Sequence, residues 1–174
     1  RSPRSNSYRL QDSVPSGDAI MSMTWSDYFL SIAEAVRQKS KDSKTKVGAV
    51  IVGPDRQVLS TGFNGFPRQI REDIPSRWEK PTKYSYVEHA ERNAIYNAAR
   101  HGVALKGCTL YMVGFGPPNV PCTDCARGVI QAGIIKVVGR PAAPATGYWK
   151  DDLILASSML TEAGIHLIDI EALP

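Results

Sequence analysis

The hydrophobic and polar positions along the chain predict a domain in which helices alternate with short buried strands. Apolar residues recur at helical spacing over residues 25–36, and Thr24 stands where it can cap that helix. Two β-branched runs follow at 47–52 and 58–63, with the turn residues Gly-Pro-Asp-Arg between them. Such a pattern predicts a β-hairpin directly after the first helix.

The second half of the chain repeats a helix–strand alternation. A polar segment with three prolines, residues 64–83, separates it from the hairpin, and a loop of that length in a compact domain is usually functional. The order helix, hairpin, then alternating helix and strand predicts a mixed sheet with helices on both faces. We expect the later helices at 88–100, 124–132 and 151–163, and the later strands at 108–113, 134–138 and 165–170.

Composition narrows this picture to a single domain in a reducing compartment. The 174 residues suit one domain with a sizeable core, which we place at 21–174, and the polar residues 1–20 are expected to be a disordered leader or an expression remnant. The chain has no signal-peptide pattern and no apolar run of membrane-spanning length, and its three cysteines fit a cytoplasmic location. The net charge of +4 permits an anionic partner without requiring one.

Two short runs carry the candidate chemistry, His-Ala-Glu at 89–91 and Pro-Cys-Thr-Asp-Cys at 121–125. One imidazole and two thiolates leave a tetrahedral Zn²⁺ with a fourth position that water can fill. The pKa of such a water falls to about 7, and Glu91 is spaced to move protons to and from it. Both runs fall near predicted helix N-termini, where the helix dipole favours thiolate over thiol.

Each run alone permits other interpretations. A lone C-x-x-C pair is also typical of a redox motif or of half a zinc ribbon, so a structural zinc module and a redox pair stay open as alternatives. A carboxylate beside an open metal position serves no purpose in a purely structural site, and Glu91 therefore favours the catalytic interpretation. The third cysteine, Cys108, lies in a predicted strand and is expected to be a small buried hydrophobe.

Several longer runs resemble one known family. They cover residues 40–49, 62–67, 84–95, 121–126 and 130–134. The chain resembles the deoxycytidylate (dCMP) deaminases of the cytidine deaminase superfamily, whose signature is H-x-E followed by P-C-x-x-C. This resemblance implies a three-layer α/β/α cytidine-deaminase-like fold with a mixed five-stranded sheet. It also implies zinc-dependent hydrolysis of dCMP to dUMP and ammonia, in pyrimidine nucleotide metabolism.

The resemblance implies roles for individual residues of the metal centre. His89, Cys122 and Cys125 would hold the zinc ion. Glu91 would take a proton from the metal-bound water and deliver it to N3 of cytosine and to the leaving ammonia.

Further roles are implied around the substrate. Asn64 would contact the sugar, although an asparagine before a glycine is also a common turn residue, and the backbone amide of Ala90 would bind the base carbonyl. The lysine-rich stretch after the first helix is equally typical of a solvated loop. The candidates for the 5′-phosphate are Lys44 and Lys46 and, before the last helix, Tyr148 and Lys150.

The resemblance also implies partners and leaves alternatives. Family members are commonly homo-oligomers, hexamers or smaller, and many respond to a dNTP effector, although we identify no residue in this chain for that control. Other substrates stay open, namely CMP, dCTP, a modified dCMP or a nucleoside. A polynucleotide substrate is less favoured because aromatic residues make up only 8% of the chain and the basic residues form no long stripe. A non-catalytic zinc module is the remaining alternative.

Overall fold

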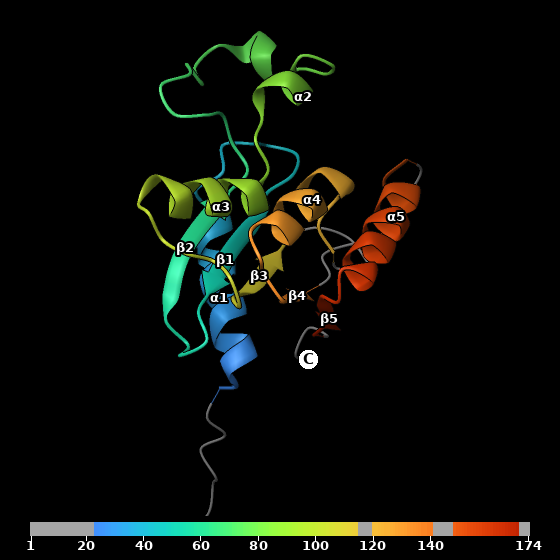
Figure 1. The fold of residues 1–174 in the computed structure, drawn as a ribbon. Helices are drawn as coiled ribbons and strands as arrows, with labels where there is room; N and C mark the ends of the chain where they lie inside the picture. Colours follow the sequence, from blue (N-terminus) through green and yellow to red (C-terminus); the bar gives the residue numbers. More distant parts are fainter. Residues whose placement is uncertain (1–22, 115–119, 141–147, 171–174) are drawn as a thin grey trace, which may run out of the picture.

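A five-stranded sheet forms the centre of the molecule (Figure 1). The computed structural model describes residues 23–114, 120–140 and 148–170, and the expected leader at 1–20 lies outside them. The order of the strands across the sheet is β2-β1-β3-β4-β5. Their bounds are β1 Gly48–Val52, β2 Val58–Phe63, β3 Thr109–Val113, β4 Lys136–Arg140 and β5 His166–Asp169.

The strand directions confirm the mixed sheet. Strand β1 is antiparallel to both β2 and β3, whereas β3, β4 and β5 run parallel to one another. Gly48, at the start of β1, pairs with Phe63 at the end of β2 and with Val113 at the end of β3. The start of β1 and the ends of the other strands therefore meet at one edge of the sheet. Ligands of open α/β sheets bind at such an edge.

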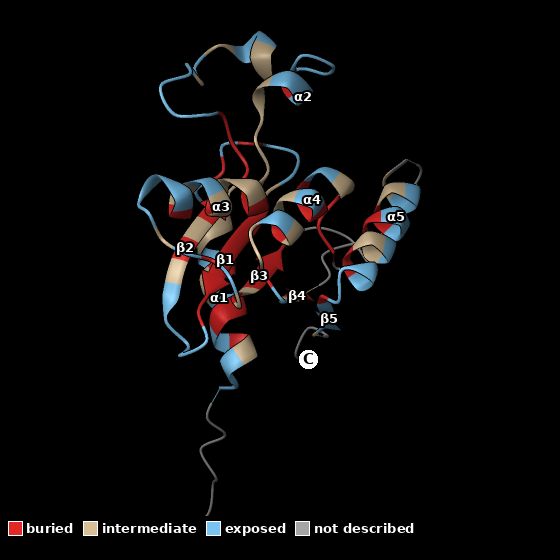
Figure 2. Ribbon diagram, viewed as in Figure 1, coloured by how far each residue is buried: buried red, intermediate tan, exposed pale blue. Residues whose placement is uncertain are grey.

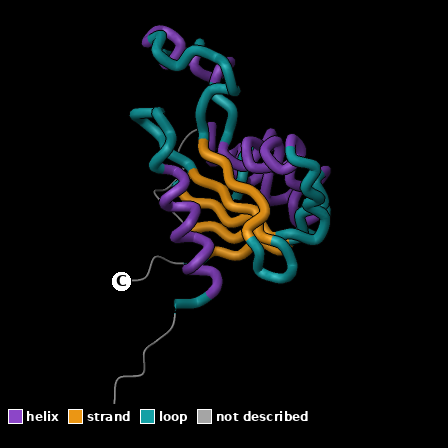
Figure 3. The backbone as a smooth tube through the Cα atoms, turned by 90° about the vertical axis from the view of Figure 1, so that its left-hand side faces the viewer, coloured by secondary structure: helices purple, strands orange, loops and turns teal. Residues whose placement is uncertain are grey.

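Helices cover both faces of the sheet, which confirms the three-layer prediction (Figure 3). Among the described helices, only α1 covers one face, where its buried residues Phe29, Leu30 and Ala33 share a core cluster with Val50 and Val138. The other face carries three helices and the larger of the two core clusters. The four long helices are α1 Trp25–Arg37, α3 Ala90–Arg100, α4 Thr123–Gln131 and α5 Tyr148–Glu162.

Local chemistry fixes where α1 begins. Thr24 is its N-cap, and the Thr24 hydroxyl oxygen accepts a hydrogen bond from the backbone N–H of Asp27 at 3.1 Å, as the sequence predicts. The Asp27 carboxylate also accepts a bond of 2.7 Å from Arg140, at the end of β4. This contact ties the first turn of α1 to the sheet beneath it.

A glycine in β2 brings α3 close to the sheet. A Cβ atom at Gly62 would lie 2.2 Å from the carbonyl oxygen of Ala90 and 2.4 Å from the backbone nitrogen of Ala94. No larger residue fits there without moving the helix. The face of α3 toward the sheet is correspondingly small, with Ala90, Ala94 and Ala98 fully buried. The first turn of α3 is therefore held against the sheet at a fixed place.

Residues 65–88, between β2 and α3, project from the body of the molecule, and we call this segment the excursion (Figure 1). It contains the 3-10 helix η1 Pro75–Trp78 and the short helix α2 Lys83–Tyr86. Most of its residues are exposed or half-buried (Figure 2). Phe66 is buried and stacks on Trp78, with the two ring centroids 4.3 Å apart. Two backbone hydrogen bonds between Gly65 and Glu88 close its base.

Within the described residues, no helix is both long and apolar enough to cross a membrane.

Candidate active site and metal centre

The two short sequence runs meet because α3 and α4 begin at the same edge of the sheet. His89 is the N-cap residue of α3, and Cys122 is the N-cap residue of α4. Cys125 follows in the first turn of α4 and is fully buried. All three side chains therefore stand at the positive ends of helix dipoles, which stabilise thiolates.

The three side chains have the geometry of a metal centre. Their ligand atoms all lie within 4.8 Å of one another. The Nδ1 atom of His89 is 3.3 Å from the Sγ atom of Cys122 and 3.4 Å from that of Cys125. Tetrahedral Zn²⁺ holds a nitrogen and a sulfur ligand about 3.5 Å apart, so the side chains fit the ion with little movement. Among the described residues the group contains no fourth ligand, which leaves one position open.

The three side chains of the metal centre shift one another's pKa values. A hydrogen bond from Cys125 and the neighbouring His89 lower the pKa of Cys122 to about 5. The hydrogen bond to the Cys122 sulfur raises the pKa of His89 to about 9, against the opposing effect of burial. The hydrogen bond between Cys125 and Cys122, together with burial, raises the pKa of the Cys125 thiol well above its ordinary value. Zn²⁺ binds thiolates and neutral imidazole, so its binding competes with protons at these three groups.

Glu91 lies directly beside this group. Its side chain is only 4% exposed, and burial raises the pKa of its carboxyl group above the ordinary value. The Sγ atom of Cys125 donates a hydrogen bond of 3.7 Å to Oε2 of Glu91. A raised pKa makes the carboxylate a stronger base than an exposed one, which suits a group that must accept a proton and return it in general acid–base catalysis.

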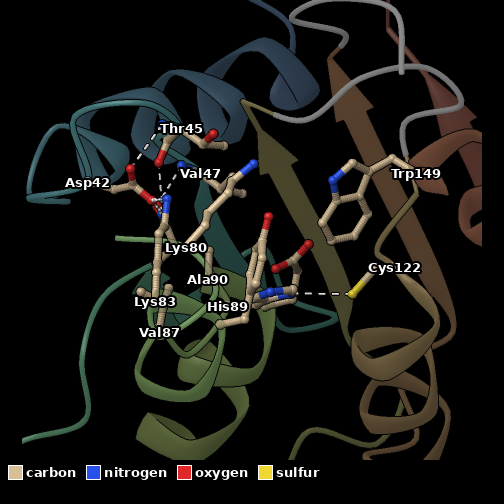
Figure 4. A pocket seen from close by; sticks show the side chains of 13 residues that line it. Asp42, Thr45, Val47, Lys80, Lys83, Val87, His89, Ala90, Cys122 and Trp149 are labelled. Atoms are coloured by element: carbon tan, nitrogen blue, oxygen red, sulfur yellow. Dashed lines mark hydrogen bonds and ion pairs between the residues drawn. The ribbon is translucent and has the colours of Figure 1, made fainter. Parts of the chain in front are cut away.

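A pocket opens above the metal ligands (Figure 4). In the figure, Asp42, Lys80 and Lys83 stand on one side, Cys122 and Trp149 on the other, and His89 between them. We call the metal ligands and Glu91 the floor, and the residues from 42–47 and from the excursion the mouth. The lining residues are Asp42, Thr45, Val47, Asn64, Lys80, Lys83, Tyr84, Val87, His89, Ala90, Glu91, Cys122 and Trp149.

Asn64 and Ala90, the two predicted contacts to sugar and base, both line this pocket. Ala90 is the first residue of α3, where backbone N–H groups have no partner within the helix. The side chain of Asn64 is engaged with its own surroundings: its Oδ1 atom accepts the Val47 N–H at 2.8 Å, and its Nδ2 atom donates to the Thr45 carbonyl at 2.8 Å.

Of the predicted phosphate contacts, the three lysines do not line the pocket. Lys44 is exposed and Lys46 half-buried, and neither lines the pocket. Tyr148 begins α5, but its side chain lies outside the described residues, and Lys150 is exposed without lining the pocket. Their role in phosphate binding stays a prediction. Trp149, between the last two, does line the pocket, and sequence reasoning missed it.

The sequence predicted a functional loop at 64–83 but singled out none of the three residues, Lys80, Lys83 and Tyr84, that the excursion supplies to the lining. Lys80 stands over the Tyr84 ring, with its Nζ atom 5.6 Å from the ring centroid. A hydrogen bond to Tyr84 raises the pKa of Lys80, so this exposed amine is cationic at neutral pH. The available signal was position, because Lys80 and Lys83 lie just before the run at 84–95 that resembles the family, and Tyr84 is its first residue.

Known proteins share this arrangement. The human deoxycytidylate deaminase is 38% identical over 122 residues, which cover 67% of this chain and 64% of that protein. The deoxycytidylate deaminase of Mycobacterium phage D29 is 35% identical over 126 residues, covering 66% of this chain and 92% of that protein. The chain thus spans less than two thirds of the length of its human relative but nearly all of the phage protein.

Solved structures agree with the fold. The apo dCMP deaminase of cyanophage S-TIM5 superposes with a TM-score of 0.63 at 25% identity, covering 83% of this chain and 96% of that one. The same phage enzyme in complex with dCMP and dUMP gives a TM-score of 0.64 at 24% identity, covering 82% of this chain and 94% of that one.

A family model decides the membership. The model of the cytidine and deoxycytidylate deaminase zinc-binding region matches residues 23–140, which include both metal-ligand runs and Glu91. Zn²⁺ is accordingly the cofactor for which His89, Cys122 and Cys125 are positioned. The chain belongs to the cytidine and deoxycytidylate deaminase family.

Proposed function

We propose that this protein hydrolyses dCMP to dUMP and ammonia. The observation that carries the proposal is the buried carboxyl group of Glu91 beside a three-ligand metal group that opens into a pocket. Zn²⁺ bound by His89, Cys122 and Cys125 would supply a Lewis acid that makes hydroxide available from water near neutral pH. A structural zinc site has no use for either the open position or the carboxylate.

Glu91 would carry the protons of the reaction. It would accept a proton at its carboxylate as the water oxygen bonds to C4 of cytosine, and deliver it to N3 of the base. It would then take the proton of the new hydroxyl group on C4 and give it to the exocyclic amine, so that the C4–N bond breaks, ammonia leaves and the C4 carbonyl forms. The burial of Glu91 beside the metal ligands and the direction of its pKa shift, upward through burial, support this double role, because the shift makes the carboxylate a stronger base.

Ala90 and Asn64 would orient the base and the sugar. The first-turn position of Ala90 supports a bond from its backbone N–H to the base carbonyl. The place of Asn64 in the pocket wall supports a sugar contact through Oδ1, whose second lone pair can accept from a hydroxyl group. Both contacts would keep C4 over the metal centre.

A 5′-phosphate is supported from two directions. The relatives named above are deoxycytidylate deaminases, and the cyanophage enzyme is described with dCMP and dUMP. In this chain, Lys80 lines the pocket and forms no ion pair with any described residue, so it is available to an anion at the mouth. Lys44, Lys46 and Tyr148, which the family resemblance implies, stay in the proposal as secondary contacts.

The test is a comparison of substrates on zinc-loaded protein. We would offer dCMP, CMP, dC, dCTP and a single-stranded oligonucleotide, and measure ammonia release together with the change in ultraviolet absorbance from cytosine to uracil. Selective turnover of dCMP is the expected result. Equal turnover of dC would remove the phosphate from the proposal, and no turnover of dCMP at full zinc occupancy would overturn it.

Assembly, control and location belong to the same proposal. We propose a homo-oligomer, which the exposed apolar side chains Ile154 and Leu155 of α5 support, and light scattering after gel filtration would measure its mass. A dNTP effector rests on the family resemblance alone, and rates with added dCTP or dTTP would test it. A cytoplasmic location is supported by three cysteines that form no disulfide.

A further inference from the structure

Two lysines of the excursion line the same pocket in opposite states. Lys80 is exposed, whereas the side chain of Lys83 is only 11% exposed and its Nζ atom lies 2.5 Å from Oδ2 of Asp42. The Asp42 side chain is 3% exposed. A buried pair of this kind is seldom retained for stability alone, because desolvation of the two charges cancels much of their attraction. The pair therefore needs another explanation.

Asp42 is the centre of a small hydrogen-bond network. Its Oδ1 atom accepts the backbone N–H groups of Lys44 at 2.9 Å and Thr45 at 3.2 Å. Its Oδ2 atom takes the Lys83 ammonium group and the Nδ2 atom of Asn64 at 3.3 Å. The two oxygen atoms of this carboxylate therefore contact four donors, two at each oxygen. Although burial alone would raise the pKa of Asp42, the bonds from Lys83 and the two amides lower it, so the group is ionised at neutral pH.

This network determines which way the Asn64 amide faces. The Nδ2 atom has two hydrogens, and it donates one to the Thr45 carbonyl and one to Asp42. The Oδ1 atom accepts the Val47 N–H at 2.8 Å. A reversed amide would place donors against the Val47 N–H and an acceptor against the carboxylate, which costs several hydrogen bonds at once. Asn64 can therefore offer substrate only an acceptor.

The same pair joins two segments that are distant in sequence. Asp42 belongs to the loop before β1, and Lys83 opens α2 in the excursion, three residues after Lys80 and one before Tyr84. Figure 4 shows the dashed contacts of this group beside Lys80 at the pocket. Loss of the pair would remove the buried contact between these two segments at the pocket wall and leave the exposed Lys41–Glu72 pair.

We propose that Asp42 and Lys83 are positioning residues, whose buried ion pair fixes the amide of Asn64 and holds Lys80 and Tyr84 at the mouth before substrate arrives. Neither charge contacts the substrate. This inference rests on the proposed deamination of dCMP for its kinetic readout. If the inference is right, nucleotide binding depends on the pair more strongly than the chemical step at the floor does.

The decisive variants are Lys83→Gln, Asp42→Asn and the double variant with both changes. Each single variant leaves one buried charge without its partner, whereas the double variant leaves two amides that can still bond to each other. We expect each single variant to raise KM for dCMP about tenfold or more, with kcat changed less than about threefold and zinc content unchanged. The double variant should lose less than the two single losses combined, because the residues act together.

Glu72→Gln is the matched control. Glu72 pairs with Lys41 at 2.6 Å and links the same loop to the same excursion, but the pair is largely solvent-exposed, with Lys41 67% exposed and Glu72 27% exposed. Neither residue lines the pocket. This variant should keep KM and kcat within about twofold of the unmodified protein, since exposed pairs contribute little.

Three outcomes would overturn the inference. The first is an unchanged KM in Lys83→Gln, and the second is a KM change in Glu72→Gln as large as in Lys83→Gln. The third is a loss of kcat and zinc that runs in parallel with KM, which would indicate general disruption. Should one single variant fail to fold, KM is measured in the other single variant, and an unchanged KM there would overturn the inference as well.

A readout without turnover separates this inference from the proposed function. If the unmodified protein does not deaminate dCMP, the proposed function fails, but the side-chain NH₂ group of Asn64 can still be followed by NMR hydrogen exchange. The inference expects slow exchange in the unmodified protein and fast exchange in Lys83→Gln. Equal exchange in both proteins would overturn the positioning role.

Discussion

The floor and the mouth of the pocket are built in different ways. The floor consists of residues on the first turns of α3 and α4, whose backbones are fixed by packing on the sheet. The mouth consists of residues from a loop and from the projecting excursion, held together by hydrogen bonds and an ion pair. Rigid helix ends suit a metal centre, which needs ligands placed within tenths of an ångström. Connected loops suit recognition of a substrate and can vary without moving the metal.

Removal of the metal should have the largest effect and should act on the floor alone. A chelator, or Cys122→Ala, is expected to abolish deamination and to lower the melting temperature, because a bound metal stabilises only the folded state. Zinc content by atomic absorption, the melting temperature and ammonia release are the measurements. Readdition of Zn²⁺ should restore the chelated protein but not Cys122→Ala. Full activity in the zinc-free protein would break the comparison.

Substitution of the acid–base group should cost almost as much activity while leaving the metal in place. Glu91→Gln is expected to reduce kcat about 10³-fold, since general acid–base groups contribute roughly 10²- to 10⁴-fold. Zinc stoichiometry and the melting temperature should stay near those of the unmodified protein. Turnover comparable to that of the unmodified protein would remove Glu91 from the mechanism.

At the mouth, loss of one cation should change binding and spare the chemistry. Lys80→Met is expected to raise KM for dCMP about tenfold, because an ion pair or charge-assisted bond of roughly 1.4 kcal/mol would be lost. Turnover of dC, which lacks the phosphate, should not change. Lys44→Met and Lys46→Met are the matched comparisons, and a larger KM effect from either would move the phosphate contact back to the sequence-based candidates.

Acid should weaken the mouth through Asp42. The bonds from Lys83 and from backbone amides hold the folded-state pKa of Asp42 below its ordinary 3.8, so its stabilising contribution is present above that pH and is lost as pH falls through the lower folded value. Asp42→Asn should cost about 3 kcal/mol at pH 7, where a buried cation is left unpaired. Urea unfolding of both proteins from pH 7 to pH 3 should show this difference shrink below pH 4. A constant difference would contradict the assignment.

Substitution of Cys108 should have the smallest effect, and it would distinguish this cysteine from the two metal ligands. It is 1% exposed, and burial raises the pKa of its thiol. Cys108→Ala should cost about 1 kcal/mol of stability from the small volume lost, and leave zinc content and kcat unchanged. Denaturation curves and zinc analysis would measure this. A loss of zinc in this variant would mean that the third cysteine takes part in the metal centre.

The floor was accessible from sequence because each of its signals is local. The residue types of the two short runs, their spacing and the helix N-termini that follow them all lie within a few residues of one another. The packing of small residues in α3, with Gly62 beneath Ala90, could be inferred only in part, since close approach depends on a distant strand. Local chemistry therefore predicted the metal ligands, but not how they are brought together.

The mouth was less accessible because it is assembled across distance. The run of basic residues at 37–46 made that segment the candidate for phosphate binding. A cluster of charges in a sequence does not show which side chains face a pocket, and in the structure Lys80 and Lys83 of the excursion line it. The helices η1 and α2 have four residues each, which is too short for a periodic pattern. In this region the sequence shows only a polar segment with prolines, from which neither short helix could be predicted.

Element boundaries were displaced where packing, not periodicity, decides them. Helix α5 begins at Tyr148 and not at 151, and it exposes Ile154 and Leu155, which blur the apolar stripe that marks a helix. Strand β4 begins at Lys136 and not at 134, because Ile134 still bonds back to Val129 of α4 and Gly133 adopts a positive φ of 75°. The first shift reflects a sequence pattern blurred by exposed apolar residues, and the second reflects a hydrogen bond at the end of α4.

The N-cap positions of His89 and Cys122 have a consequence for folding. In the unfolded chain the cysteines at 122 and 125 are close neighbours, but the histidine is more than thirty residues away and joins them only once α3 and α4 have packed on the sheet. Metal affinity is therefore thermodynamically linked to the whole tertiary structure. A destabilising substitution far from the pocket would appear first as incomplete zinc loading, so zinc occupancy in a purified sample reports on the integrity of the fold.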